Sequence, residues 1–370
     1  MNDQYVHITN GDAAAERIRA SGIPGEVLPW RESWLDGPAE PIWERPDATA
    51  RRASWLEREL GIPAPVYALQ RRELLTALDR AWSGEAEIVL WFEYDLFDQA
   101  MLASLLHLLS RKAEIPRSFG RAHTPAAGRP AGAVSAAGTG MPGGEACPRE
   151  PVPGLSWVIA DSFPGVTDFR GLGQLTPAQI DSLWPQRTPV LTGQLAAGAR
   201  AWTAFASPDP SAVEDWLGRD AAVLPVMAEA LRVHLKRLPA KEDGLGIVER
   251  TVLRLLERSG AFTPDKLFQA ASAELAMLGM GDLTFWAELK RMAGRPVPLI
   301  EIEGAEPLPS FTAPHPADWS MWQIRAAGAG LEALKGNPVR RKRGDGEFHG
   351  GGRWLGGYFA ADSFPKPPRA

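Results

Sequence analysis

Two short groups of polar residues follow apolar runs of strand length, and their types suit joint chemistry. Glu93 and Asp95 come directly after the run Ile88–Phe92, and Asn10 and Asp12 follow an earlier β-prone run. Carboxylates that lie close together raise each other's pKa, which suits acid–base catalysis, or they bind a hard cation such as Mg²⁺ through oxygen. We therefore predict Glu93 and Asp95 as catalytic residues and magnesium ligands, with Asn10 and Asp12 binding the substrate.

Three further residues are candidates for the same site. Arg31 follows the second predicted strand and would pair with an anionic group, while Asp36 lies in an Asp-Gly-Pro turn that can fold back over the site. His7 would act as a base if its ring reached the end of the first strand. Structural alternatives stay open: Asp12 and Asp95 can each cap a helix, and His7 between two apolar neighbours can be a core histidine.

The predicted elements bring these positions to one edge of a sheet. Four β-prone segments are separated by helical ones, which is typical of parallel strands joined by right-handed crossovers. The fold class that this order indicates is α/β, with a small doubly wound parallel sheet. Ligands bind outside the carboxyl ends of such strands, where Asn10, Asp12, Arg31, Glu93 and Asp95 are expected to lie. The predicted strands are Tyr5–Thr9, Glu26–Pro29, Ile88–Phe92 and Leu155–Ala160.

The rest of the chain divides by composition. Segment 119–154 consists mainly of Ala, Gly and Pro, so it cannot bury enough apolar surface to offset its ordering entropy, and we expect a disordered insertion. Near the end, three amphipathic helical segments precede a β-prone run, the order typical of a winged helix. The predicted parts are an α/β domain (1–118 with 155–168), the insertion, a helical region (169–240), a helical, winged-helix-like domain (241–334) and a flexible tail (335–370).

Composition and missing motifs exclude several function classes. Forty basic and forty-five acidic side chains leave a net charge of −5, so no overall field attracts DNA or an anionic membrane. One cysteine, Cys147, excludes a disulfide framework and a thiolate zinc finger. The polar start and the short apolar stretches predict a cytoplasmic protein with no membrane partner. The dinucleotide, Walker and nucleophile-elbow motifs are absent from the sequence.

Three classes of function stay open at this point. The first is an enzyme, hydrolase- or transferase-like, that binds a small or nucleotide-like molecule at the acidic edge. The second is a regulator whose C-terminal helices bind DNA, and the third is an adaptor whose tryptophan-rich helical surface, among 14 tryptophans, docks a protein. The basic side chains available to phosphates are Lys290, Arg291 and Arg295 in a predicted helix and Arg340, Arg341, Lys342 and Arg343 in the tail.

Several strings resemble a bacterial family. The strings are Val6-His7-Ile8-Thr9-Asn10-Gly11-Asp12, Gly25-Glu26-Val27-Leu28-Pro29-Trp30-Arg31, Leu90-Trp91-Phe92-Glu93-Tyr94-Asp95-Leu96-Phe97-Asp98-Gln99 and Phe169-Arg170-Gly171-Leu172-Gly173-Gln174-Leu175-Thr176-Pro177. Together they are similar to the family called domain of unknown function 1835. Segment 224–286 and the string Arg353-Trp354-Leu355-Gly356-Gly357 resemble its C-terminal companion, domain of unknown function 3658. The resemblance implies the domain organisation and no particular reaction.

Two positions depart from the pattern of that family. Members often have histidine where this chain has Tyr94, and another histidine where it has Leu35, just before the acid of the Gly-Pro turn. If those histidines take part in catalysis, this chain would have an altered activity or none. The last residues, 362–367, also lack the tryptophan-rich ending that the resemblance leads us to expect.

Overall fold

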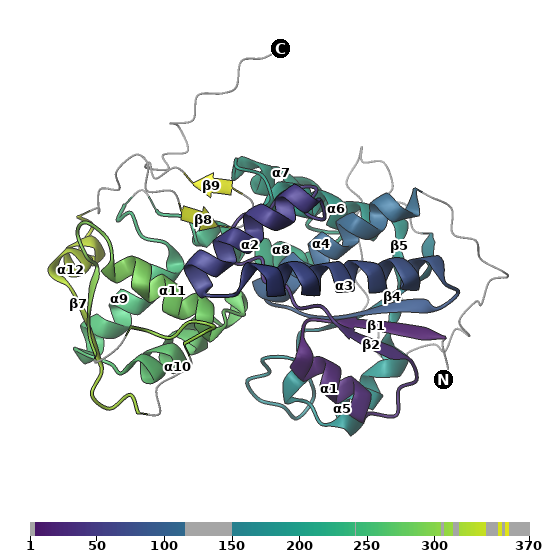
Figure 1. Ribbon diagram of the computed structural model, residues 1–370, viewed down its shortest axis with the longest axis horizontal. Helices are drawn as coiled ribbons and strands as arrows, with labels where there is room; N and C mark the ends of the chain where they lie inside the picture. The colour runs from purple at the N-terminus through teal and green to yellow at the C-terminus, as the bar shows by residue number, and fades with distance from the viewer. Residues whose placement is uncertain are drawn as a thin grey trace, which may run out of the picture.

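A mostly parallel five-stranded sheet lies at the centre of the N-terminal part of the molecule (Figure 1). The computed structural model describes residues 4–114, 150–240, 242–304, 307–313 and 318–337, and the backbone of 347–349 and 352–354. The strand order is β2-β1-β3-β4-β5; β1 to β4 pair with one another in parallel and β5 pairs antiparallel with β4, so the α/β class is confirmed. The strands are β1 (Tyr5–Thr9), β2 (Glu26–Pro29), β3 (Glu87–Glu93), β4 (Pro151–Ala160) and β5 (Thr188–Leu191).

Helices cover both faces of this sheet, because its central strand is apolar on both sides. In β3, Ile88, Leu90 and Phe92 belong to the core that includes α3 and α4, whereas Val89 and Trp91 pack on the other face with α1 and α5. Alternate side chains of a strand point to opposite faces, which explains the unbroken apolar run. The helices of this part are α1 (Asp12–Ala20), α2 (Pro46–Leu60), α3 (Ala64–Ser83), α4 (Leu96–Ala113), α5 (Pro177–Leu183), α6 (Thr192–Phe205), α7 (Ser211–Asp220) and α8 (Pro225–Lys236).

The C-terminal part contains three helices followed by a hairpin. Strand β6 pairs antiparallel with β7, and Phe262, between the first two helices, bridges to Ile324 of β7. The winged-helix ending stays a prediction. The elements are α9 (Ile247–Ser259), α10 (Pro264–Glu274), α11 (Asp282–Ala293), β6 (Ile300–Glu303), β7 (Gln323–Ala326) and α12 (Gly328–Leu334), then the short pair β8 (Glu347–His349) and β9 (Gly352–Trp354).

Two predicted boundaries were wrong. Strand β4 begins at Pro151, inside the predicted insertion, and the remainder of that insertion, 119–149 with Cys147, lies outside the described residues. Region 169–240 is not wholly helical, because β5 adds an antiparallel strand to the sheet edge beside β4. A four-residue edge strand that contains a proline gives almost no signal in a sequence.

The tryptophans do not form the docking surface that the adaptor hypothesis requires. Every tryptophan side chain in the described residues is buried or half-buried, and Trp34, Trp43, Trp202, Trp216 and Trp286 are among the largest fully buried groups. They fill the core between the helices instead of lying on a helical surface. Among the described helices, none combines the length and apolar character needed to cross a bilayer.

Candidate functional site

Three buried carboxylates meet where β3 leads into α4. Glu93 is the last residue of β3, Asp95 is the residue before α4, and Asp98 lies in the first turn of that helix. Each offers a carboxylate oxygen, and these oxygens all lie within 4.8 Å of one another. The cluster lies at the carboxyl edge of the sheet, where we expected Glu93 and Asp95 to act.

Backbone and amide hydrogens hold the three carboxylates in place. Asp98 accepts the backbone N–H of Glu93 (2.8 Å) through Oδ1 and the amide of Asn10 (2.9 Å) through Oδ2. Asp95 caps α4, because its Oδ1 accepts the backbone N–H of Asp98 at 2.9 Å. The side-chain amide of Gln99 donates to the carbonyl of Glu93. Asn10, the residue after β1, therefore contacts the cluster, since β1 and β3 are neighbours in the sheet, and its role in substrate binding stays a prediction.

Two glycines bring distant backbone against the carboxylates. The N–H of Leu172 donates to Glu93 Oε1 at 2.6 Å, and a Cβ on the preceding Gly171 would lie 2.1 Å from Glu93 Oε2. On the other side, a Cβ on Gly279, which follows the 3₁₀ turn η3 (Ala276–Leu278), would lie 2.2 Å from Asp95 Oδ2. Any side chain at either position would collide with the carboxylate and displace it.

Burial and mutual repulsion favour the protonated forms of the three carboxyl groups. Burial raises the pKa of Glu93 to about 7 and that of Asp95 to about 6, and it raises the pKa of Asp98 well above its ordinary range. The negative charges of Glu93 and Asp95 raise the pKa of Asp98 further. In the described part of the chain, no lysine or arginine acts on these three groups. A bound cation would supply the missing positive charge.

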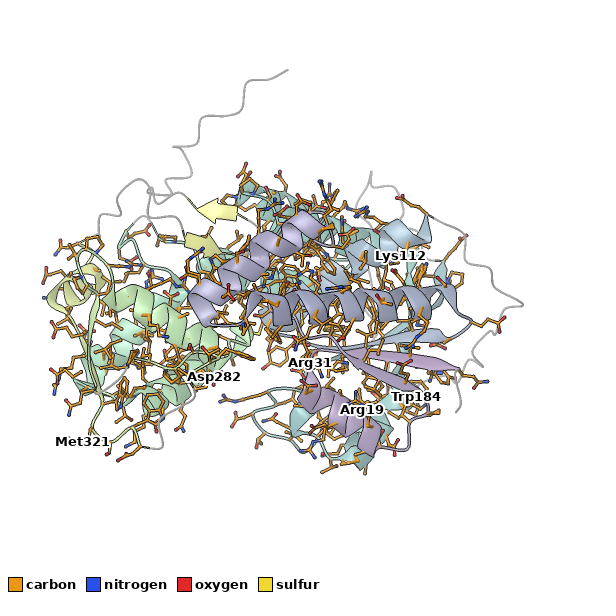
Figure 2. The ribbon with its side chains drawn as sticks, in the orientation of Figure 1. Arg19, Arg31, Lys112, Trp184, Asp282 and Met321 are labelled. Atoms are coloured by element: carbon orange, nitrogen blue, oxygen red, sulfur yellow. The ribbon has the colours of Figure 1, made fainter. Side chains whose placement is uncertain are left out.

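Asp12 and Arg31 partner each other at the same edge of the sheet. The guanidinium of Arg31 binds both carboxylate oxygens of Asp12, at 2.8 and 2.6 Å. The pair is exposed, and Figure 2 shows Arg31 on the side of the sheet that is turned toward α11, where Asp282 is labelled. Each of the two side chains already has a partner of opposite charge. Substrate binding by Asp12 and pairing of Arg31 with an anionic group therefore stay predictions.

This exposed pair should contribute little to stability. We expect Arg31→Ala to lower the free energy of unfolding by less than about 1 kcal/mol, because exposed ion pairs gain little over their hydrated ions. Urea unfolding at low and moderate salt measures the change. A loss well above that value would mean that Arg31 does more than hold Asp12.

Asp36 lies in a different environment from the one predicted. The carboxylate is buried, and it pairs with Arg237 after α8 (3.3 Å) and with Arg291 of α11 (3.5 Å). A buried carboxylate needs such partners, because an unpaired one is costly to desolvate. Asp36 therefore links the N-terminal part to the C-terminal helices, and the structure does not bring it into the carboxylate cluster.

His7 is also held away from the cluster. Its Nδ1 accepts the indole N–H of Trp91 (3.1 Å), and its Nε2 lies 3.0 Å from the carbonyl oxygen of Pro24. Burial lowers its pKa, so the ring is neutral at pH 7. Both nitrogens thus have partners within the core, which is the structural alternative to the predicted base.

Tyr94, one of the departures from the family pattern, donates its hydroxyl to the carbonyl of Phe169 at 3.1 Å.

The helix proposed for DNA recognition has its basic residues engaged. Lys290 donates to the carbonyl of Pro309, Arg291 pairs with Asp36 and Glu288, and Arg295 pairs with Glu249. Helix α11 also packs against α2, through buried Ala287 among others. Because these three basic side chains already have partners within the protein, they give no support to DNA binding by this helix. The other basic group, Arg340, Arg341, Lys342 and Arg343, lies outside the described residues.

The sequence reasoning missed Asp98, Gly171 as a wall of the site, and Gly279. Asp98 had a usable signal: it stands three residues after the capping Asp95, and residues three apart lie on one side of a helix. The string Gly171-Leu172-Gly173 precedes a capped helix, and its Leu172 N–H donates to the carboxylate of Glu93. Gly279 comes from the C-terminal part, and no local pattern indicates its partner.

Comparison with known proteins gives no further assignment. No protein-family model matches the chain, and no curated protein is significantly similar to it. The resemblance in the N-terminal strings stays an expectation. The string Leu90–Gln99, which carries much of it, is also the segment that supplies all three carboxylates.

Proposed function

We propose that the chain binds a divalent cation of the Mg²⁺ class through Glu93, Asp95 and Asp98 and acts as a hydrolase- or transferase-like enzyme at this edge of the sheet. The observation that carries the proposal is the convergence of three buried carboxylate oxygens within 4.8 Å, with no paired cationic side chain in the described residues. Carboxylates with such spacing are oxygen ligands for a hard cation. A bound Mg²⁺ would polarise a phosphoryl or carbonyl oxygen of a substrate.

The surroundings of the carboxylates support this proposal. Gly171 and Gly279 let two distant backbone segments lie directly against the carboxylates of Glu93 and Asp95, which a side chain at either position would displace. Asn10 donates to Asp98 and so helps to fix the position of that carboxylate. In the absence of a cation, a pKa of about 7 lets Glu93 exchange a proton near neutral pH, the property of a general acid or base.

Cation titration tests the proposal. We expect the protein to bind Mg²⁺ or Mn²⁺ saturably in calorimetry. Glu93→Gln should weaken this binding by at least about tenfold, because even the loss of a residue that only supports a metal ligand costs a metal site about that much affinity. The variant keeps an oxygen that can accept the Leu172 N–H. Asp161→Asn is the matched control, because Asp161 is an exposed acid at the end of β4, and it should bind like the original protein. Equal affinity of the two variants would reject the proposal.

A further inference from the structure

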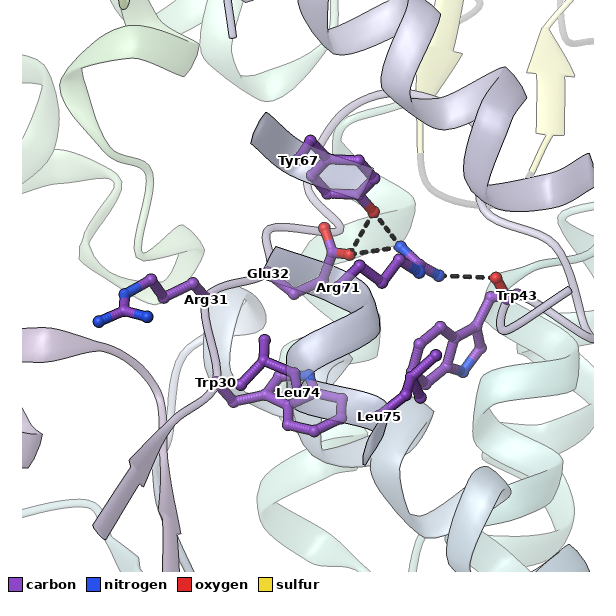
Figure 3. A pocket seen from close by; sticks show the side chains of 8 residues that line it. All are labelled: Trp30, Arg31, Glu32, Trp43, Tyr67, Arg71, Leu74 and Leu75. Atoms are coloured by element: carbon purple, nitrogen blue, oxygen red, sulfur yellow. Dashed lines mark hydrogen bonds and ion pairs between the residues drawn. The ribbon is translucent and has the colours of Figure 1, made fainter. Parts of the chain in front are cut away.

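A small cavity lies between the end of β2 and helix α3 (Figure 3). Its volume is about 10 Å³, room for about one water-sized group of atoms. The side chains of Trp30, Trp43, Leu74 and Leu75 line it together with that of Arg71. Arg31 is the exposed residue among those that line the cavity, and its side chain points away from the others.

A buried ionic network borders this cavity and has one positive charge in excess. Glu32 pairs with Arg71 at 2.8 Å and with Arg52 at 3.0 Å, and it accepts the hydroxyl of Tyr67 at 2.7 Å. Burial opposes ionisation of Glu32, but the two guanidinium groups outweigh it and keep its pKa below the ordinary value. The network therefore holds two positive charges and one negative charge. The second guanidinium has no carboxylate of its own in this network.

Two buried hydrogen-bond donors at the cavity have no acceptor within the described residues. They are the indole Nε1 of Trp30 and the Nε of Arg71, whose other nitrogens bind Glu32, Tyr67 and the carbonyl of Trp43. Trp30 is 3 % exposed and Arg71 is 5 % exposed, so bulk water does not satisfy either group. Unmet donors at this depth are costly, and buried polar groups of native proteins nearly always have a partner.

We propose that this cavity binds the carboxylate end of a small organic acid. One carboxylate oxygen enters the cavity and accepts the N–H groups of Trp30 and Arg71, and its negative charge balances the excess guanidinium. The rest of the ligand extends past Arg31 to the carboxyl edge of the sheet. A phosphate group fits less well, because the cavity admits one oxygen and offers a single net positive charge.

This subsite does not depend on the proposed cation site. Strands β2 and β3 are both neighbours of β1, so their ends stand about 10 Å apart, twice the usual spacing of strands. One ligand of moderate length can therefore reach both. Since Trp30 takes no part in holding Glu93, Asp95 or Asp98, carboxylate binding should survive in EDTA and in Glu93→Gln.

Indole resonances of protein labelled with ¹⁵N-tryptophan test this inference. Sodium acetate is titrated against sodium chloride at constant ionic strength in EDTA, and the Trp30 signal is assigned by its loss in Trp30→Phe. We expect the Trp30 signal to move saturably with acetate. In Trp30→Phe, the Trp43 signal reports acetate binding. The variant should bind acetate about tenfold more weakly, because it loses a hydrogen bond to a charged group while it keeps an aromatic ring. Trp184→Phe, on the other face of the sheet, should leave the affinity unchanged.

Three outcomes would overturn the inference. A Trp30 signal that acetate does not move would mean that the cavity holds only water. A larger response to sodium phosphate than to acetate would reject the carboxylate as the ligand class. Equal acetate affinity in Trp30→Phe and the original protein would place the binding elsewhere. Because all titrations are in EDTA, a failed cation site affects none of these results.

Discussion

We expect Gly171→Ala to eliminate saturable cation binding in a protein that still folds. The added methyl group would stand 2.1 Å from Glu93 Oε2 and 2.4 Å from the carboxylate carbon, so the Glu93 side chain must leave its position. That movement breaks the bond from the Leu172 N–H and takes one carboxylate out of the cluster. Calorimetric titration with Mg²⁺ and Mn²⁺ measures the loss.

The same substitution also strains the backbone, and a second glycine separates the two effects. Gly171 has φ 143° and ψ 172°, and Gly11 has φ 149° and ψ −170°, while a Cβ on Gly11 would meet nothing within 4 Å. Each alanine should lower the free energy of unfolding by about 1–3 kcal/mol, the cost of a conformation that only glycine readily adopts. Gly11→Ala should nevertheless bind the cation. Loss of binding in both variants would show that strain, not the position of Glu93, is the cause.

The sequence predicts the half of the site that local rules govern. Glu93 and Asp95 end an apolar run and open a helix, and both signals are contained within ten residues. Asn10 follows from topology, because β1 and β3 are adjacent parallel strands and their ends must meet at one edge. The sequence also predicts the four main strands of the sheet, because each contains a β-prone run, and two of them have the predicted bounds in full.

The rest depends on packing between distant segments. Gly279 approaches Asp95 from more than 180 residues away, and a glycine in a turn has no sequence signal for what it touches. Asp36 and Arg31 were placed by proximity to strand ends, but charge decides their partners: buried Asp36 takes Arg237 and Arg291, and exposed Arg31 takes Asp12. His7 shows a third limit, because the indole that occupies its Nδ1 comes from the neighbouring strand.

The stability of the cation-free protein should fall as the pH rises through neutrality, and Glu93→Gln should remove much of that fall. Burial raises the pKa of Glu93 from an ordinary 4.5 to about 7, so the folded state favours its protonated form. The resulting stabilisation is complete below the unfolded pKa of about 4.5 and is lost as the pH passes the folded pKa of about 7. The difference between these two pKa values corresponds to about 3 kcal/mol for this buried group.

Urea unfolding in EDTA from about pH 5 to about pH 8 measures this difference between the original protein and Glu93→Gln. The variant should be relatively more stable at the upper end, because an amide has no charge to desolvate. Asp161→Asn should follow the original protein at every pH, since its side chain is exposed. Parallel curves for the original protein and Glu93→Gln would contradict the prediction. Added Mg²⁺ should reverse the order at high pH, because the cation stabilises the ionised cluster that the variant can no longer complete.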